Sequence, residues 1–176
     1  MMRKFYRIDL TNATEDYFLK VGEEAYISFW NVTQVPLRIA TQDGTCYEMH
    51  IIPANTGGTS GAITNDAYLY PNNTTYSNSF VFAYMYRSGY TFTGQYLTYS
   101  AFRIGGAFFV GTVWITNRTQ YKNTRFILSG YGFSTGYPNL GVGSCDWRDT
   151  TTPWVSLGTV VFSQSSSGEI LVRRLK

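Results

Sequence analysis

The segment TCYEMHII, residues 45–52, carries three side chains that could take part in catalysis. Cys46, Glu48 and His50 alternate along it, so an extended chain would place all three on one face. A thiol with an imidazole and a carboxylate is a set used in nucleophilic catalysis. Neighbouring side chains on one strand face lie about 7 Å apart, and Cys46 and His50 are separated by twice that distance. The row therefore predicts the outward polar face of an ordinary strand, and we expect no catalytic residues and no enzyme.

The sequence also offers few residues that could bind a metal or a cofactor. One histidine and two distant cysteines cannot form a zinc cage of known spacing. Asp146 and Asp149 could offer oxygens to Ca²⁺, but two acids in a loop more often cap turns or face solvent. We expect no metal and no cofactor. Cys46 and Cys145 are expected to be free thiols, unless the fold brings their Cα atoms within about 7 Å.

The segment GYPNLGVGSCDWRDTTTPW, residues 136–154, suggests contact with a sugar. Its rings and neighbouring polar groups are the kind that bind carbohydrate without hydrolysing it, and the candidate residues are Tyr137, Asn139, Trp147, Asp149 and Trp154. A tryptophan in a long loop can equally pin that loop to the body of the domain. Both interpretations stay open at this point.

The elements that would position these residues have a period of two. In SFVFAYMYR, residues 79–87, aromatic residues alternate with other types, which is typical of a β-strand. Further strands are expected at 5–10, 25–32, 45–52, 67–70, 94–103, 106–117, 125–133, 154–162 and 168–175, with long loops at 53–66, 71–79 and 134–153. About ten strands without a helical pattern predict one all-β domain over residues 1–176, an antiparallel β-sandwich with two sheets of about five strands.

Aromatic residues make up 18% of the chain and charged residues only 14%. Rings occur on both faces of the strands between residues 79 and 117, and a sandwich sheet has only one inner face. Outward rings would then form an apolar patch of the kind that monomers seldom expose. We therefore expect a homo-oligomer, with contact residues among Tyr84, Tyr99, Phe108 and Trp114.

The charge pattern limits the partners. Basic residues gather at the two ends of the chain, at Arg3, Lys4 and Arg7 and at Arg173, Arg174 and Lys176. A nucleic-acid partner would favour a continuous basic stripe, so none is expected. The sequence has no apolar segment long enough to span a membrane and no secretory signal, so we expect no membrane partner and folding in a cytoplasm.

The tail TTPWVSLGTVVFSQSSSGEILVRRLK, residues 151–176, resembles the closing hairpin of small all-β structural proteins of tailed bacteriophages and related viral surface proteins. The resemblance implies a jelly-roll-like sandwich that serves as a capsid decoration, head-fibre or tail component of a virion. It also implies assembly in the host cytoplasm, contacts with other virion proteins, and a trimer by analogy with viral appendages. The alternative function is a carbohydrate-binding module or receptor-binding tip that uses the loop aromatics.

Overall fold

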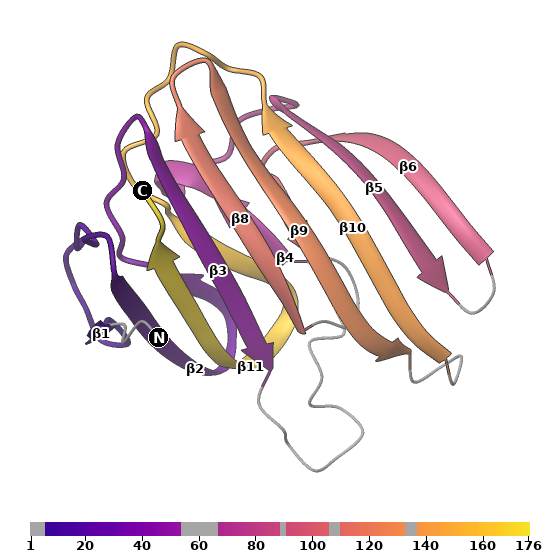
Figure 1. The fold of residues 1–176 in the computed structure, drawn as a ribbon, viewed down its shortest axis with the longest axis horizontal. Coiled ribbons are helices and arrows are strands. Elements are labelled where there is room, and N and C mark those ends of the chain that lie inside the picture. The colour runs from indigo at the N-terminus through magenta and orange to yellow at the C-terminus, as the bar shows by residue number, and fades with distance from the viewer. Residues whose placement is uncertain (1–5, 54–66, 89–90, 106–109, 133–136) are drawn as a thin grey trace.

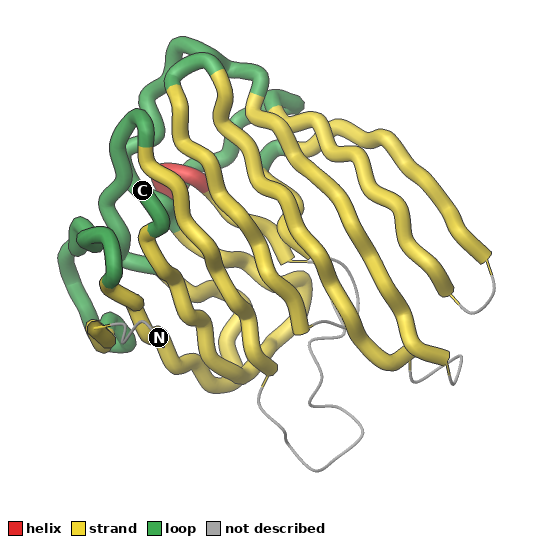
Figure 2. Tube along the Cα trace, in the orientation of Figure 1, coloured by secondary structure: helices red, strands yellow, loops and turns green. Residues whose placement is uncertain are grey.

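A computed structural model describes residues 6–53, 67–88, 91–105, 110–132 and 137–176. Side chains at positions 53, 84, 86–88, 91–96, 105, 110, 128–132 and 137–140 are not described. The described residues form strands and connecting loops, with one short 3₁₀ helix, as Figure 2 shows. The elements in Figure 1 are β1 (Tyr6–Asp9), β2 (Glu23–Pro36), β3 (Thr45–Pro53), β4 (Ala67–Tyr70), η1 (Pro71–Asn73), β5 (Phe80–Ser88), β6 (Thr91–Tyr99), β7 (Phe102–Gly105), β8 (Val110–Arg118), β9 (Tyr121–Gly132), β10 (Tyr137–Trp147) and β11 (Thr159–Arg174).

The strands form a sandwich with one large and one small layer. The large sheet has the order β1-β2-β11-β3-β8-β9-β10-β5-β6. Behind it, β4 pairs with β11 on one side and with β7 on the other, and β7 contacts β9, β10 and β5 (Figure 1). The all-β sandwich is therefore confirmed, but the two layers are unequal rather than five strands each. The sheet is also mixed, because β1 pairs with β2 in parallel.

Two long strands, β2 and β11, belong to both layers. The first part of β11, Thr159–Phe162, pairs with β4, whereas its second part, from Gly168 onward, pairs with β3. β2 accompanies β11 along both parts. The register between them shifts on either side of Ser166, and such bulges bend a strand and increase its twist. One bent strand pair thus connects the layers.

β11 corrects a prediction. The sequence suggested two strands joined by a turn at the Ser- and Gly-rich segment SQSSSG, residues 163–168. In the structure this segment is the irregular middle of a single strand. The closing hairpin that carried the resemblance to phage proteins is therefore one bent strand, and the jelly-roll arrangement stays a prediction.

β10 was missed in the sequence, where residues 134–153 were interpreted as one loop. The strand Tyr137–Trp147 pairs with both β9 and β5. Pro138, Gly141 and Gly143 interrupt the alternation of apolar residues that normally indicates a strand. The expected strand at 94–103 is likewise divided, because β6 ends at Tyr99 and β7 begins at Phe102.

The space between the layers is filled mainly by large apolar side chains. Tyr47, Met49 and Ile51 point inward from β3, which leaves Cys46, Glu48 and His50 on the outer face. At the opposite end of the core, rings pack closely against one another: Phe80, Phe102, Trp147 and Trp154, with Tyr76 at their margin. Of the described rings in the aromatic stretch at 79–103, Phe80, Phe82 and Phe102 are therefore core.

Candidate interaction face

The large sheet has an outer face that points away from β4 and β7. Strand registers place five residues in one row across this face, on β1, β2, β11, β3 and β8 in turn: Arg7, Glu24, Arg173, Glu48 and Trp114. We call this row the ladder. Residues directly opposite on neighbouring strands are close enough to interact, so the ladder ties five strands together.

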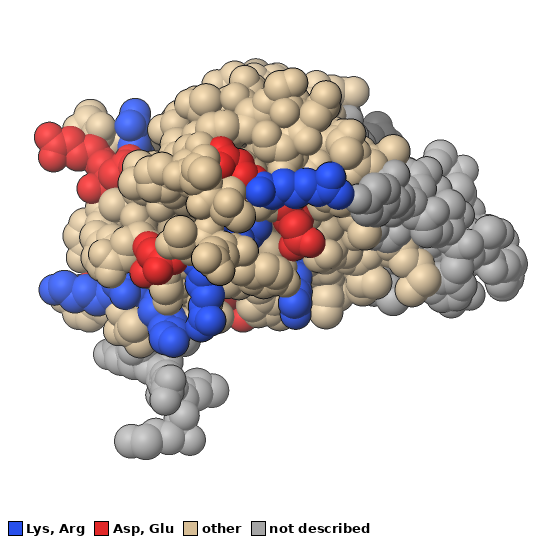
Figure 3. All heavy atoms as spheres, turned by 90° about the horizontal axis from the view of Figure 1, so that it is seen from above, with Lys and Arg blue, Asp and Glu red and all other residues tan. Residues whose placement is uncertain are grey.

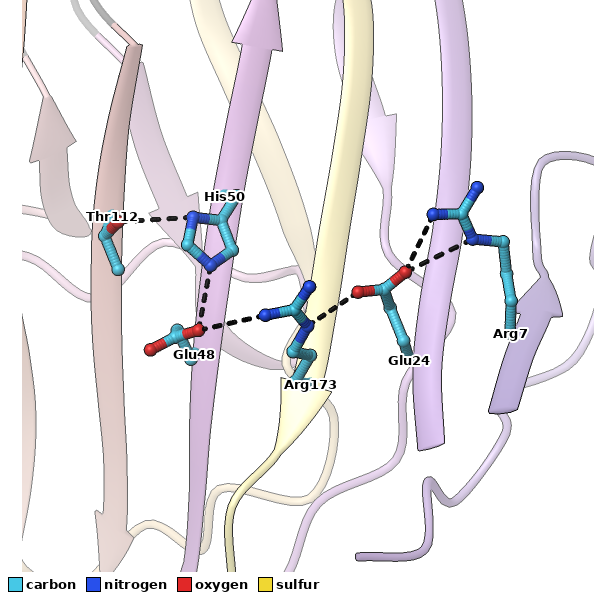
Figure 4. A network of polar contacts seen from close by, with 6 residues as sticks. All are labelled: Arg7, Glu24, Glu48, His50, Thr112 and Arg173. Atoms are coloured by element: carbon cyan, nitrogen blue, oxygen red, sulfur yellow. Dashed lines mark hydrogen bonds and ion pairs between the residues drawn. The ribbon is translucent and has the colours of Figure 1, made fainter. Parts of the chain in front are cut away.

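Ion pairs connect the first four members of the ladder (Figure 4). Arg7 donates to Glu24 at 3.0 Å, and Arg173 donates to the other oxygen of Glu24 at 2.6 Å. Arg173 also lies 3.6 Å from Glu48. The Glu24 side chain is only 4% exposed, whereas that of Arg7 is 59% exposed. The carboxylate is thus buried between two guanidinium groups, an arrangement in which each buried charge has a partner of opposite sign.

Glu48 continues the network toward His50 and Thr112. The His50 Nε2 atom lies 2.8 Å from a Glu48 oxygen, and its Nδ1 atom lies 3.2 Å from the Thr112 hydroxyl. Trp114 donates its indole N–H to the other Glu48 oxygen at 3.2 Å. If Nε2 carries the proton that Glu48 accepts, Nδ1 accepts from Thr112. Hydroxyl, imidazole and carboxylate then stand in the order of a nucleophile relay.

The relay lacks the surroundings that acyl transfer requires. An oxyanion hole is commonly built from converging backbone N–H groups, and here His50 and Thr112 lie on strands flanked by partners on both sides. Their backbone N–H and C=O groups therefore take part in the pairing of neighbouring strands and do not converge on a substrate oxygen. We interpret the three side chains as a polar tie between β3 and β8. Sequence reasoning missed Thr112 because it lies 62 residues from His50 and only strand pairing brings the two together.

Two open hollows adjoin the ladder on the same face. One, of about 510 Å³, is lined by His50, Thr112, Trp114 and Arg173 among others. The second, of about 600 Å³, is lined by Trp114 with Tyr121, Arg125 and Val142 among others. Trp114 and Ile127 border both, so the ring forms the ridge between them.

An apolar strip runs beside the second hollow. Ile127 on β9, Val142 on β10 and Met85 on β5 are opposite one another in the strand registers, and all three are exposed. Trp114 itself is half-buried on the same face. We define the outer-face patch as Trp114, Ile127, Val142 and Met85. Exposed apolar side chains grouped in this way are typical of a contact surface.

The structure separates the four rings that were expected in an oligomer contact. Trp114 lies on the outer face, as that expectation requires. Tyr99 is opposite Phe80 and packs its ring near Phe82 and Tyr68, so it faces inward and does not belong to the outer face. The Tyr84 side chain and Phe108 lie outside the described residues.

The residues suggested for sugar contact are not brought together as a platform. Trp147 is 3% exposed and Trp154 is 2% exposed, so both rings are core and neither can stack on a ligand. This corrects the expectation for these two residues and matches the alternative, in which they pin the loop to the domain. Asp149 accepts hydrogen bonds from Thr151 and Thr152, which lowers the pKa of its carboxyl well below the usual range. The side chains of Tyr137 and Asn139 are not described.

In the described part of the chain, Cys46 and Cys145 are free thiols. Among the described residues, no group of three or more His, Cys, Asp or Glu is arranged to hold a metal ion. Within the same part of the chain, no helix has the length and apolar character needed to cross a membrane. In the view from above, Lys and Arg lie interspersed with Asp and Glu, so charges of both signs share that face (Figure 3).

Comparison with known proteins gave no match among family models, curated proteins or solved structures.

Proposed function

We propose that the protein is a non-enzymatic virion structural protein, a capsid decoration, head-fibre or tail component of a bacteriophage. It acts through protein–protein contacts made by the outer-face patch. The observation that carries this proposal is the group of exposed apolar side chains around Trp114, on a face that the small layer leaves uncovered. Tryptophan is among the residue types that most often anchor interfaces.

The ladder beside the patch suits the same role. Its side chains are tied to one another across five strands, so little conformational freedom is left for a partner to remove. A preorganised surface loses less entropy on binding. The assignment to a phage rests on the sequence resemblance of residues 151–176, although Thr159–Arg174 forms one bent strand and not a hairpin, and on the low content of charged residues.

Particle association tests the proposal. Particles purified from a culture that carries this gene should contain the chain, and Trp114→Ser should reduce its amount in the particle fraction at least tenfold. Trp30→Ser is the matched control, because Trp30 is an exposed ring on β2 outside the patch. Absence of the wild-type chain from particles, or equal losses for both variants, would overturn the proposal.

A further inference from the structure

The β5–β6 hairpin ends the large sheet at an open edge. β6 pairs with β5 along all nine residues, from Phe80 opposite Tyr99 to Ser88 opposite Thr91, without a bulge. No strand pairs with the other side of β6 among the described residues. That side offers a row of backbone N–H and C=O groups, which is a template for another strand.

This edge lacks the features that usually block pairing. The β6 sequence TFTGQYLTY contains no Lys, Arg, Asp, Glu or Pro. Natural edge strands are commonly protected by charges, proline, bulges or short length. The opposite edge of the sheet has such protection, because β1 is four residues long and carries Arg7 and Asp9. β6 is long, regular and neutral.

The hairpin also extends beyond its own cover. β7 contacts β5, where Phe80 and Phe82 are buried. Leu97 lies opposite Phe82 on the same inner side and is nevertheless 39% exposed. β5 is paired with β10 on its other side, so β6 is the strand of this hairpin that lacks a second partner among the described residues. A further strand at β6 would therefore add both backbone hydrogen bonds and side-chain cover.

We propose that β6 pairs antiparallel with β6 of a second copy of this chain, forming a two-fold symmetric dimer with a sheet continuous across both copies. A second copy supplies a strand of equal length that is equally uncharged, so like charges do not meet. Full overlap of the two strands places Gln95 opposite its own copy and Gly94 opposite Tyr96, and an aromatic residue across from a glycine is a favourable cross-strand pair.

This dimer is independent of the proposed function, because it uses the sheet edge and not the outer-face patch. A two-fold contact is isologous, so the same strand serves both partners. It predicts a dimer or an assembly of dimers. The trimer expected by viral analogy would contradict it.

Sedimentation of the purified full chain over a range of concentrations tests the pairing. The wild type should form dimers, and Gln95→Lys should weaken the dimer at least tenfold because it places two ammonium groups directly opposite each other. Gln120→Lys is the control, since Gln120 is exposed in the turn between β8 and β9. Circular dichroism should show that both variants keep the wild-type strand content. A monomeric wild type, or a dimer unaffected by Gln95→Lys, would overturn the proposal.

Cross-linking tests the register. Cα atoms of directly opposed antiparallel residues lie about 4.5 to 5.5 Å apart, within reach of a disulfide. Oxidised Gln95→Cys should therefore run as a covalent dimer, whereas Ser77→Cys, at an exposed loop position, and the wild type should not. Dimers in solution without a Gln95→Cys cross-link would show that another surface or register is used.

Discussion

The two ends of the large sheet are built in different ways. At the β1–β2–β11–β3 end, charged side chains connect one strand to the next across the outer face. At the β10–β5–β6 end, order comes from rings packed in the core, and the outer face carries the exposed apolar side chains of Val142 and Met85. The edge strand is charged and short at the first end and neutral and long at the second.

One edge of the sheet is therefore protected against pairing with a further strand, whereas the other edge is available for it. Arg7 and Asp9 on β1 would have to lose water before another strand could approach, which is unfavourable for charged groups. β6 imposes no such cost. On the outer face the two ends meet at Trp114, which is the last residue of the ladder and the first of the patch.

The largest expected effect comes from the ring-packed end. Phe80 is fully buried between Trp147 and Phe102, with ring centroids at 5.4 and 4.6 Å. Phe80→Ala should lower the free energy of unfolding by about 3–5 kcal/mol, from lost burial and the cavity left behind. Urea denaturation measures it, with Val81→Ala on the opposite face of the strand as the control. If both variants lost the same free energy of unfolding, the packed rings would not be what stabilises this end of the sheet.

A smaller effect is expected at the ladder end. Glu24→Gln keeps the shape but removes the charge that faces Arg7 and Arg173, and it should cost about 2 kcal/mol of unfolding free energy. Arg7→Ala should cost under about 1 kcal/mol, because that side chain is mostly exposed. If the two substitutions cost the same, burial is not what makes the ladder stable.

Two separate aspartates, Asp43 before β3 and Asp149 after β10, should make the stability of the protein depend on pH. Hydrogen bonds from Thr152 and Thr151 lower the pKa of Asp149, after β10, well below its usual range, and hydrogen bonding with Thr119 lowers the pKa of Asp43, before β3. A folded-state pKa below the unfolded value adds stability above that value, which is lost as the carboxyl is protonated. Asp149→Asn should therefore lower Tm at pH 7 more than Asp43→Asn does. Both deficits should shrink as pH falls below about 4, and thermal scans from pH 7 to pH 2 measure them. A deficit that is constant with pH would contradict this.

At the β10 side of the core, burial should change the reactivity of a thiol without any change in overall stability. Burial raises the pKa of Cys145 to about 12, whereas Cys46 on β3 is half-exposed. In the native protein at pH 8, iodoacetamide should label Cys145 at least about a hundredfold more slowly than in urea, because so little thiolate is present. Peptide mapping by mass spectrometry distinguishes the two thiols. Rapid native labelling of Cys145 would show that β10 opens readily.

The all-β class and most strand positions could be predicted from the sequence, because the alternation of buried and exposed residues along a strand is a local property. It failed at β10, where proline and glycines hide the alternation, and at SQSSSG, where a bulge has the composition of a turn. The outward position of Cys46, Glu48 and His50 was also predictable from spacing. The ladder was not, since Arg7, Glu24 and Arg173 meet only through pairing of strands that are distant in sequence.

The place of β11 in the sheet sets the timing of folding during synthesis. A ribosome makes β11 after every other strand described, yet β11 lies between β2 and β3 in the large sheet and pairs with β4 in the small layer. A nascent chain that ends before Thr159 therefore has two sheet fragments with a missing strand between them. Long-range pairing of this kind is slow. The incomplete chain should present open edges to chaperones and proteases until its sixteen-residue β11 emerges and joins the fragments.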